Sequence, residues 1–207
     1  MATVNGTVGA NADDGQIYYN TSWIQADGIT IWFGWYNSNP DLAYIRFTLS
    51  GAIASGSTIS SAVLSVAGHD ANACTDFWAC VSESADAPQV IWASHRPAWA
   101  NTDAAGDITT YPTTREGSGA IHWTSYSWHT DGTVENLTVT GLVQHLVDTY
   151  GGLASGAHIQ FYLCADDSET DGDENGFIAK DAGGVSPTLA ITYTAGGGAT
   201  NTVRMII

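Results

Sequence analysis

Positively charged side chains are scarce in this sequence, which has five Lys and Arg residues against 21 Asp and Glu residues. The formal net charge is −16 at pH 7 and the sequence pI is about 4.2. This charge argues against binding to nucleic acids and to anionic membrane surfaces, since both require Lys and Arg. The charged fraction of 13% is about half the usual one. Ser, Thr, Asn and 23 Gly residues therefore supply most of the polarity.

Long apolar runs are also missing. The longest uncharged stretch, residues 47–68, is rich in Gly, Ser and Thr, and it predicts two strands and a loop rather than a membrane span. Residues 1–10 have no basic region and no apolar core, so no signal peptide is visible. We expect an extracellular protein or one on a virion surface, reached after removal of a leader or by release at cell lysis.

Cysteine is sparse, with only Cys74, Cys80 and Cys164. Three cysteines do not form a disulfide framework. Cys74 and Cys80 can pair only if their strand curls back on itself, and the alternative is three buried free thiols that behave as small apolar residues. A structural zinc site is not expected, because no Cys-x-x-Cys or His-x-x-x-His spacing is present.

Alternating apolar and polar residues predict a largely β structure. In residues 44–49, Ile45, Phe47 and Leu49 share one face, as expected for a half-buried strand. The other clear strands are 61–67, 158–164 and 188–193. Weaker patterns predict strands at 16–19, 30–35, 76–81, 120–128 and 134–139. Many short strands with Gly-rich turns are typical of an all-β sandwich or jelly roll.

One segment, residues 141–150, has helical periodicity instead. Its apolar stripe consists of Leu142, Val143, Leu146, Val147 and Tyr150. Thr140 is the expected N-cap and Gly151 the expected residue after the helix end. The predicted fold is therefore an all-β jelly-roll β-sandwich with one short α-helix around 141–150, in a single domain covering residues 1–194.

Residues 195–207 form a separate C-terminal segment. Gly196, Gly197 and Gly198 make a flexible hinge, and an apolar, strand-prone arm follows. The arm residues are Val203, Arg204, Met205, Ile206 and Ile207. The arm either returns to its own sheet, adds as a strand to a neighbouring chain, or is disordered. The second alternative predicts a protein partner, or a second copy of this chain, bound through the arm.

Several segments, in order along the chain, resemble the DNRLRE-type, disaggregatase-related jelly-roll β-sandwich family. The matching segments are 44–49, 56–64, 90–92 with 97–99, 139–144, 156–163 and 187–193. They look like the family's opening strand and Gly-x-x-Ile-x-x-Ala-x-Leu motif, its Trp-bearing crossover, its Val-Thr-x-Leu-Val-Gln helix and its closing Pro-x-Leu-x-Ile-x-Tyr strand. The resemblance implies a sandwich without catalysis of its own, similar to carbohydrate-binding modules and also found in phage particles.

The strongest local signal is the acidic run at residues 166–176. Asp167, Glu169 and Asp171, followed by Gly172, have the spacing of the first half of an EF-hand loop. Position twelve is Ile178 instead of Glu, so the segment is not an EF-hand. Two interpretations remain open, a calcium-binding turn and a solvated acidic hairpin loop. The candidate calcium ligands are Asp167, Glu169, Asp171 and Asp173.

No motif predicts catalysis. The acidic residues crowd into Gly- and Ser-rich loops without singling out a pair for glycoside hydrolysis. The chain has Gly117-Ser118-Gly119 but no Gly-x-Ser-x-Gly nucleophile elbow. The six His residues are scattered. We expect no catalytic residues.

Aromatic residues are the remaining candidates for a binding site, with eight Trp and nine Tyr in 207 residues. Trp and Tyr rings stack on the flat CH faces of sugars. The candidate ligand-binding residues are Trp32, Trp35, Tyr36, Trp123, Tyr126 and Trp128. Trp123 and Tyr126 are three residues apart, so they cannot share the face of one strand. The alternative is that these rings build the core.

Two function hypotheses follow. The first is a non-catalytic structural or adhesive subunit of an extracellular assembly, most plausibly a phage virion decoration or fibre protein. The second is a secreted carbohydrate-binding module stabilised by calcium. Both predict glycans or proteins as partners, with no nucleic acid and no membrane.

Overall fold

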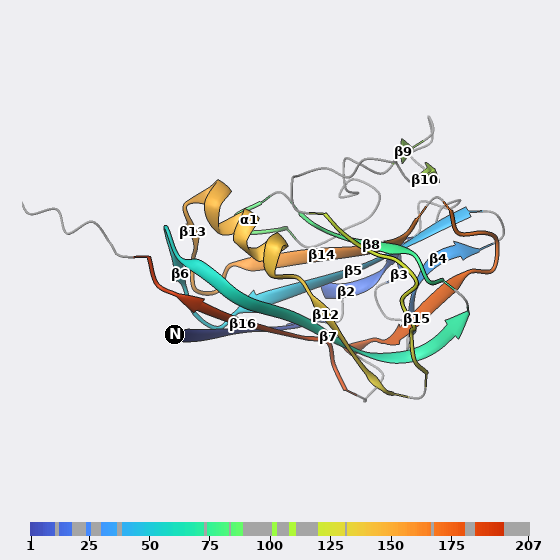
Figure 1. The fold of residues 1–207 in the computed structure, drawn as a ribbon, viewed down its shortest axis with the longest axis horizontal. Coiled ribbons are helices and arrows are strands. Elements are labelled where there is room, and N and C mark those ends of the chain that lie inside the picture. The colour runs from blue at the N-terminus through green and yellow to red at the C-terminus, as the bar shows by residue number, and fades with distance from the viewer. Residues whose placement is uncertain are drawn as a thin grey trace, which may run out of the picture.

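The computed structural model describes residues 1–10, 13–17, 24–25, 30–36, 39–72, 74–82, 84–88, 101–102, 108–110, 120–130, 132–166, 168–180 and 185–196. These residues form two packed layers of antiparallel strands with one short helix (Figure 1). The predicted fold class, an all-β jelly-roll sandwich with one helix, is confirmed. Among the described residues, no helix has the length and apolar character that crossing a membrane requires.

The first layer has the strand order β2–β5–β14–β8–β11, and β3 adds to β2. Its strands are β2 (Asp14–Ile17), β3 (Ile24–Gln25), β5 (Asn39–Leu49), β8 (Phe77–Val81), β11 (Ile121–Trp123) and β14 (His158–Ala165). The second layer has the order β1–β16–β7–β15–β4, and β12 also pairs with β7. Its strands are β1 (Ala2–Thr7), β4 (Thr30–Tyr36), β7 (Thr58–Asn72), β12 (Val134–Thr138), β15 (Glu174–Ile178) and β16 (Thr188–Thr194).

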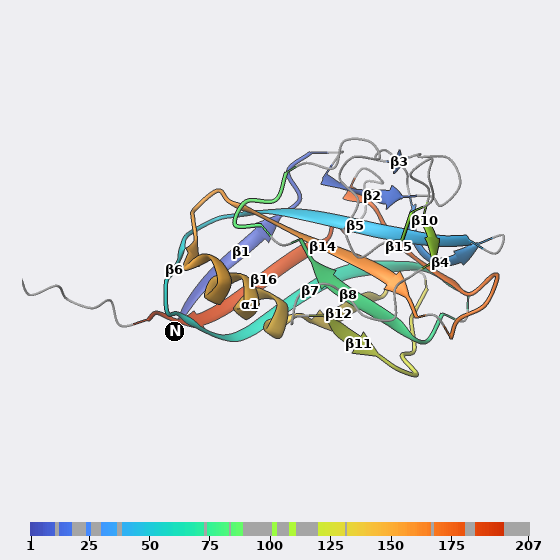
Figure 2. The ribbon, with the colours of Figure 1, turned by 90° about the horizontal axis from the view of Figure 1, so that it is seen from above.

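Strand β5 joins the two layers at both of its ends. Asn39, Pro40 and Asp41 pair with β4, and Thr48 and Leu49 pair with β1. Two short pairs complete the structure, β6 (Ile53–Ala54) with β13 (Gly152–Leu153) and β9 (Asn101–Thr102) with β10 (Ile108–Thr110). Helix α1 (Thr140–Tyr150) packs on β7 and β13 at one end of the molecule, and β4 and β15 extend towards the other end (Figure 2).

The core lies between the layers and consists of the inward residues that the alternation predicted. Ile45, Phe47 and Leu49 are buried opposite their β14 neighbours, and the Phe47 and Phe161 rings lie 6.1 Å apart between centroids. The opposite face of β5 and β14 is also buried, as Tyr44 and Tyr162 show. The alternation of residues 44–49 therefore does not separate core from solvent, and β10 is one element that packs over β5.

Several strand boundaries differ from the sequence prediction, as for β7, which spans Thr58–Asn72 instead of 61–67. The strand expected at 16–19 begins earlier, at Asp14, and residues 18 and 19 lie outside the described residues. The strand expected at 120–128 ends at Trp123, and Ser125 adopts a left-handed backbone conformation with φ 54°. A non-glycine residue in this region marks a turn, which sequence periodicity does not predict.

Helix α1 confirms the periodicity of 141–150 but corrects the cap. The N-cap residue is Val139, which makes no side-chain capping bond, so the prediction of Thr140 as N-cap is wrong. The Thr140 Oγ1 instead accepts a hydrogen bond from the Ala62 N–H of β7 at 2.9 Å. Gly151 ends the helix in the left-handed conformation with φ 68°, as predicted. Tyr150, assigned to the apolar stripe, is exposed.

Cys74, Cys80 and Cys164 are buried free thiols, so Cys74 and Cys80 form no disulfide.

Candidate functional site

The Trp123, Tyr126 and Trp128 cluster packs around the buried ring of Phe77. The Trp123 ring stacks on Phe77 with 5.1 Å between centroids, and Tyr126 meets Phe77 edge-on at 5.4 Å. Because Ser125 breaks the strand, both rings reach the same side, contrary to the expectation for a continuous strand. Trp128 is 7% exposed and donates its indole N–H to the Gly176 carbonyl at 3.1 Å. The structure thus places these rings in or against the core, as in the alternative weighed above.

The second predicted cluster, Trp32, Trp35 and Tyr36, is divided by the structure. The Trp35 indole N–H donates to the Asp166 carbonyl at 3.3 Å, so this ring lies beside the acidic loop. Trp32 lies with its indole over Gly176 of β15, away from that contact. The Tyr36 side chain lies outside the described residues.

The Trp32 indole lies across a position of the sheet that has no side chain, Gly176 of β15. In the strand register, Gly176 of β15 pairs with Trp32 of β4 on one side and with Asp70 of β7 on the other. A Cβ atom at Gly176 would lie 3.2 Å from the indole Cε3 and 3.3 Å from Cδ2. Only glycine leaves this space for the ring, because any side chain at position 176 would displace it. Trp32 remains partly exposed, and His69 meets it edge-on at 6.3 Å.

Carboxylates border this ring. Glu174 lies two residues before Gly176 on β15 and therefore on the same face of the strand. Partial burial, with the nearby charges of Asp171 and Asp70, raises the pKa of Glu174 to about 7. We call Trp32, His69, Asp70, Glu174 and Gly176 the Trp32 platform. Of these residues, the sequence pattern predicted only Trp32 as a binding residue, because the row forms only when β4, β15 and β7 pair.

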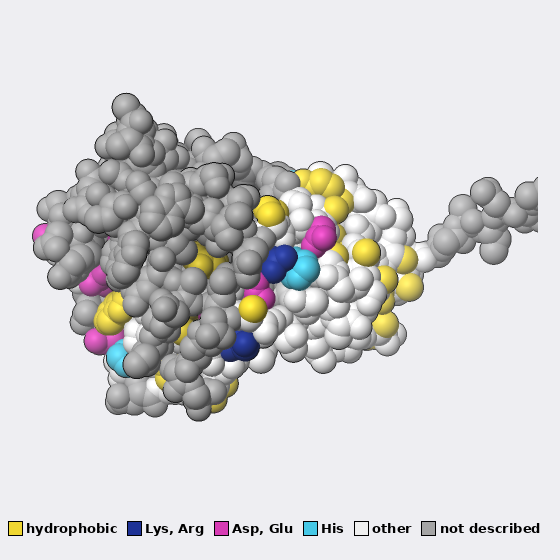
Figure 3. Space-filling model, turned by 180° about the vertical axis from the view of Figure 1, so that it is seen from behind, with side chains coloured by type: hydrophobic (Ala, Val, Ile, Leu, Met, Phe, Trp, Pro, Cys, Tyr) yellow, Lys and Arg dark blue, Asp and Glu magenta, His cyan; other side chains and the backbone are white. Residues whose placement is uncertain are grey.

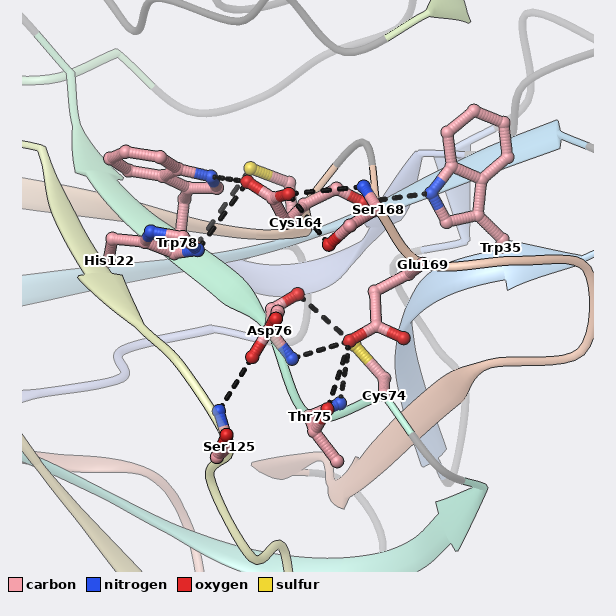
Figure 4. A network of polar contacts seen from close by, with 11 residues as sticks. Trp35, Cys74, Thr75, Asp76, Trp78, His122, Ser125, Cys164, Ser168 and Glu169 are labelled. Carbon is pink, nitrogen blue, oxygen red and sulfur yellow. Dashed lines mark hydrogen bonds and ion pairs between the residues drawn. The ribbon is translucent and has the colours of Figure 1, made fainter.

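Carboxylates of the predicted calcium loop are bonded to the protein itself (Figure 4). One oxygen of Glu169 accepts from the Thr75 N–H at 2.9 Å, the Thr75 hydroxyl at 3.3 Å and the Asp76 N–H at 2.5 Å. The Asp173 Oδ2 accepts from both the N–H and the hydroxyl of Thr170 at 2.7 Å.

The bonds of Glu169 join the loop to Thr75 and Asp76, and those of Asp173 close a turn within the loop. Asp167 lies outside the described residues. Among those that are described, no group of three or more His, Cys, Asp or Glu side chains is arranged to hold a metal ion. The calcium site therefore stays a prediction.

Asp166 contacts a second set of aromatic rings, Trp78 and His122, which are labelled in Figure 4. Its Oδ2 accepts from the Trp78 indole N–H at 2.6 Å and lies 3.4 Å from the His122 Nε2. The two rings stack with 4.1 Å between centroids. Burial raises the pKa of Asp166, but hydrogen bonds from Trp78 and Ser168 and the nearby His122 bring it below its ordinary value. This cluster ties β8, β11 and the end of β14 together.

Acidic side chains gather at the end of the molecule formed by β4 and β15. Figure 3 shows several of them at this end of one face, whereas the basic side chains on that face lie nearer its middle. The two described basic residues are both bonded to the protein: Arg46 pairs with Asp13 at 2.8 Å, and the Lys180 Nζ donates to the Gly9 carbonyl at 3.2 Å. Among the described residues, the charged side chains beside Glu174 are therefore acidic, namely Asp70 and Asp171.

The sequence was compared with models of known protein families and with curated proteins, and neither comparison found a match.

Proposed function

We propose that this protein is a non-catalytic, glycan-binding adhesive protein whose binding surface is the Trp32 platform. The observation that supports the proposal is the partly exposed Trp32 indole lying across Gly176, in one row with Asp70. A flat aromatic ring on a rigid sheet offers a stacking surface for the CH face of a sugar ring. The adjacent carboxylates can accept hydrogen bonds from sugar hydroxyls, which fix the orientation of the ligand.

The position of the ring on the sheet favours binding over a purely structural role. Trp128 and Trp123, which have structural roles, pack on Phe77. Trp32 instead covers a glycine and meets His69, an exposed residue of β7, at its edge. The resemblance to the jelly-roll family that includes carbohydrate-binding modules supports the same function.

A glycan array probed with the full chain tests the proposal. We expect binding to at least one class of glycan and a loss of about tenfold or more in affinity for Trp32→Ala, equivalent to about 1.4 kcal/mol. The matched control is Tyr150→Ala, which removes another exposed aromatic ring on α1 at the other end of the molecule. Absence of binding to every glycan class, or equal losses for the two variants, would overturn the proposal.

A second variant tests the ring position without removing the ring. Gly176→Ala places a Cβ 2.9 Å from the Thr30 Cγ2 and 3.2 Å from Trp32, so the indole must shift. We expect weaker glycan binding with Trp32 still present. Unchanged affinity in a folded Gly176→Ala variant would show that the ring's position over Gly176 is irrelevant.

We also propose that such an adhesive protein acts as part of an extracellular assembly, as a phage virion decoration or fibre subunit. This proposal depends on the apolar arm at Val203–Ile207, which lies outside the described residues. Light-scattering masses of the full chain and of a chain ending at Ala195 test it. Assembly of the full chain alone would support the proposal, whereas two monomers would contradict self-assembly through the arm.

A further inference from the structure

We infer that the Trp32 platform selects glycans with free ammonium groups, that is, unacetylated amino sugars, and that Glu174 determines this selectivity. The inference rests on the proposed function, because it names the class of glycan that the same surface takes. The supporting observations are the Trp32 ring, the position of the Glu174 carboxylate near it, and the lack of a hydrogen-bond donor to that carboxylate among the described residues.

Glu174 is a diagonal neighbour of Trp32 in the strand register. It pairs with Gly34 of β4 on one side and Asn72 of β7 on the other, one same-face step from the row of Trp32, Gly176 and Asp70. Diagonal neighbours on one face of an antiparallel pair lie about 7–8 Å apart, within reach of long side chains. Because its β4 partner is Gly34, that partner contributes no side chain between the carboxylate and the indole.

The carboxylate of Glu174 differs from its acidic neighbours in having no hydrogen-bond donor within the described part of the chain. Glu169 accepts three hydrogen bonds and Asp173 two, and the Asp70 Oδ1 accepts from the Ala71 N–H at 2.9 Å. Glu174 is partly buried and faces the like charges of Asp70 and Asp171. A partly buried carboxylate without a donor gains more from a hydrogen-bond donor or a cation than one that is already bonded.

An ammonium group meets these conditions better than a neutral or an acidic ligand group. It supplies N–H donors and a positive charge to Glu174. It also interacts favourably with the face of a Trp ring. A sugar carboxylate would instead be repelled by the same three acidic residues. A hard metal ion needs six or more oxygen ligands, and no metal-binding group is present among the described side chains.

The test compares oligoglucosamine, its N-acetylated counterpart and oligogalacturonate by calorimetry with the full chain at pH 7. We expect oligoglucosamine to bind about tenfold more tightly than the acetylated oligomer, as expected for one added charge-assisted contact, and oligogalacturonate not to bind. Glu174→Gln should abolish this preference, so that the two glucosamine oligomers bind with equal affinity. Asp70→Asn is the second variant, expected to reduce the preference in part.

The matched control is Asp148→Asn, which removes one negative charge on α1. It should keep the full preference. Equal affinities of the unaltered protein for the two glucosamine oligomers would overturn this inference and leave glycan binding intact. If Glu174→Gln and Asp148→Asn lowered the preference for oligoglucosamine equally, the preference would depend on the overall charge of the protein. That result would overturn the role of Glu174. Absence of binding to all three oligomers and to the array would overturn the proposed function as well.

Discussion

At the scale of single residues, the tryptophans of this protein differ by what lies beneath them. Trp128 and Trp123 pack on Phe77, whereas Trp32 lies on Gly176. Gly176 contributes to both arrangements, since its carbonyl accepts the Trp128 N–H and its missing side chain leaves room for Trp32. The residue type alone therefore does not distinguish a core ring from a surface ring.

Glu174 leads to a prediction about pH. Its pKa is raised in the folded protein to about 7 from an ordinary value of 4.5. Between these two pH values, Glu174 therefore binds more protons in the folded state than in the unfolded state. The stability contribution of this group is therefore greatest below pH 4.5 and is lost as the pH rises to about 7. We expect Glu174→Gln to remove this loss and to be more stable than the unaltered protein at pH 8, measured by urea unfolding.

Asp166 serves as a control, because its pKa is shifted in the opposite direction to that of Glu174. Its pKa lies below the ordinary value in the folded protein, so its contribution is present above the unfolded pKa and is lost as the pH falls through the folded pKa. Asp166→Asn should therefore lower stability at neutral pH and change it little in strong acid. A Glu174→Gln variant that is less stable than the unaltered protein at pH 8 would contradict the assignment.

Trp128 leads to a second prediction at this scale. Trp128→Phe leaves the buried Gly176 carbonyl without its donor and opens space in the core. We expect a loss of about 2 kcal/mol in the free energy of unfolding. Trp123→Phe, whose ring can still stack on Phe77, should lose less. Equal losses in denaturant unfolding would show that the hydrogen bond contributes little.

At the scale of elements, helix α1 continues the edge of the second layer where β12 ends. The last β12 pair is Thr138 with Val63, and the next residue, Val139, donates its N–H to the Ala62 carbonyl at 2.8 Å. Beyond this point, helix side chains bond the backbone of β7 in place of a paired strand. Thr140 accepts from the Ala62 N–H, and Gln144 accepts from the Ile59 N–H at 2.7 Å. The Val-Thr-x-Leu-Val-Gln segment therefore has a physical role, in which Thr140 and Gln144 satisfy backbone donors of β7.

Gln144 should be the more sensitive of these two positions. Its amide N–H also donates to the Ser57 carbonyl at 3.1 Å, so the side chain bonds a donor and an acceptor of the β7 edge. Gln144→Leu leaves both groups without this partner, and we expect a loss of about 2 kcal/mol in unfolding free energy. Gln144→Glu keeps the acceptor for Ile59 and should lose less. Thermal unfolding that does not distinguish Leu from Glu would contradict this role.

At the scale of the whole molecule, the closed sandwich protects all three thiols. Cys74, Cys80 and Cys164 are buried. Burial is also the main cause that raises the pKa of the Cys74 thiol. We expect no reaction with a thiol reagent under native conditions and reaction of three thiols per chain after unfolding. The melting temperature should be the same with and without a reductant. Rapid native labelling, or a reductant-sensitive melting temperature, would contradict the structure.

Sequence periodicity worked best where apolar residues alternate along a strand or form one stripe of a helix. It located the strands at 44–49, 61–67, 158–164 and 188–193 and the helix at 141–150, because these patterns follow directly from the geometry of strands and helices. It was wrong for Thr140, because the donor that this residue bonds lies on β7, 78 positions earlier in the chain. Local capping rules do not include such a partner.

The sequence by itself determined the fold class, the negative charge and the supply of aromatic rings, since composition and short-range periodicity control these properties. Only the tertiary structure decided which ring lies on the surface and which acids lie beside it. Trp32, Asp70 and Gly176 are brought together by the pairing of β4, β15 and β7. That register depends on packing across the whole sandwich, and a glycine 144 positions away from Trp32 leaves the space for its ring.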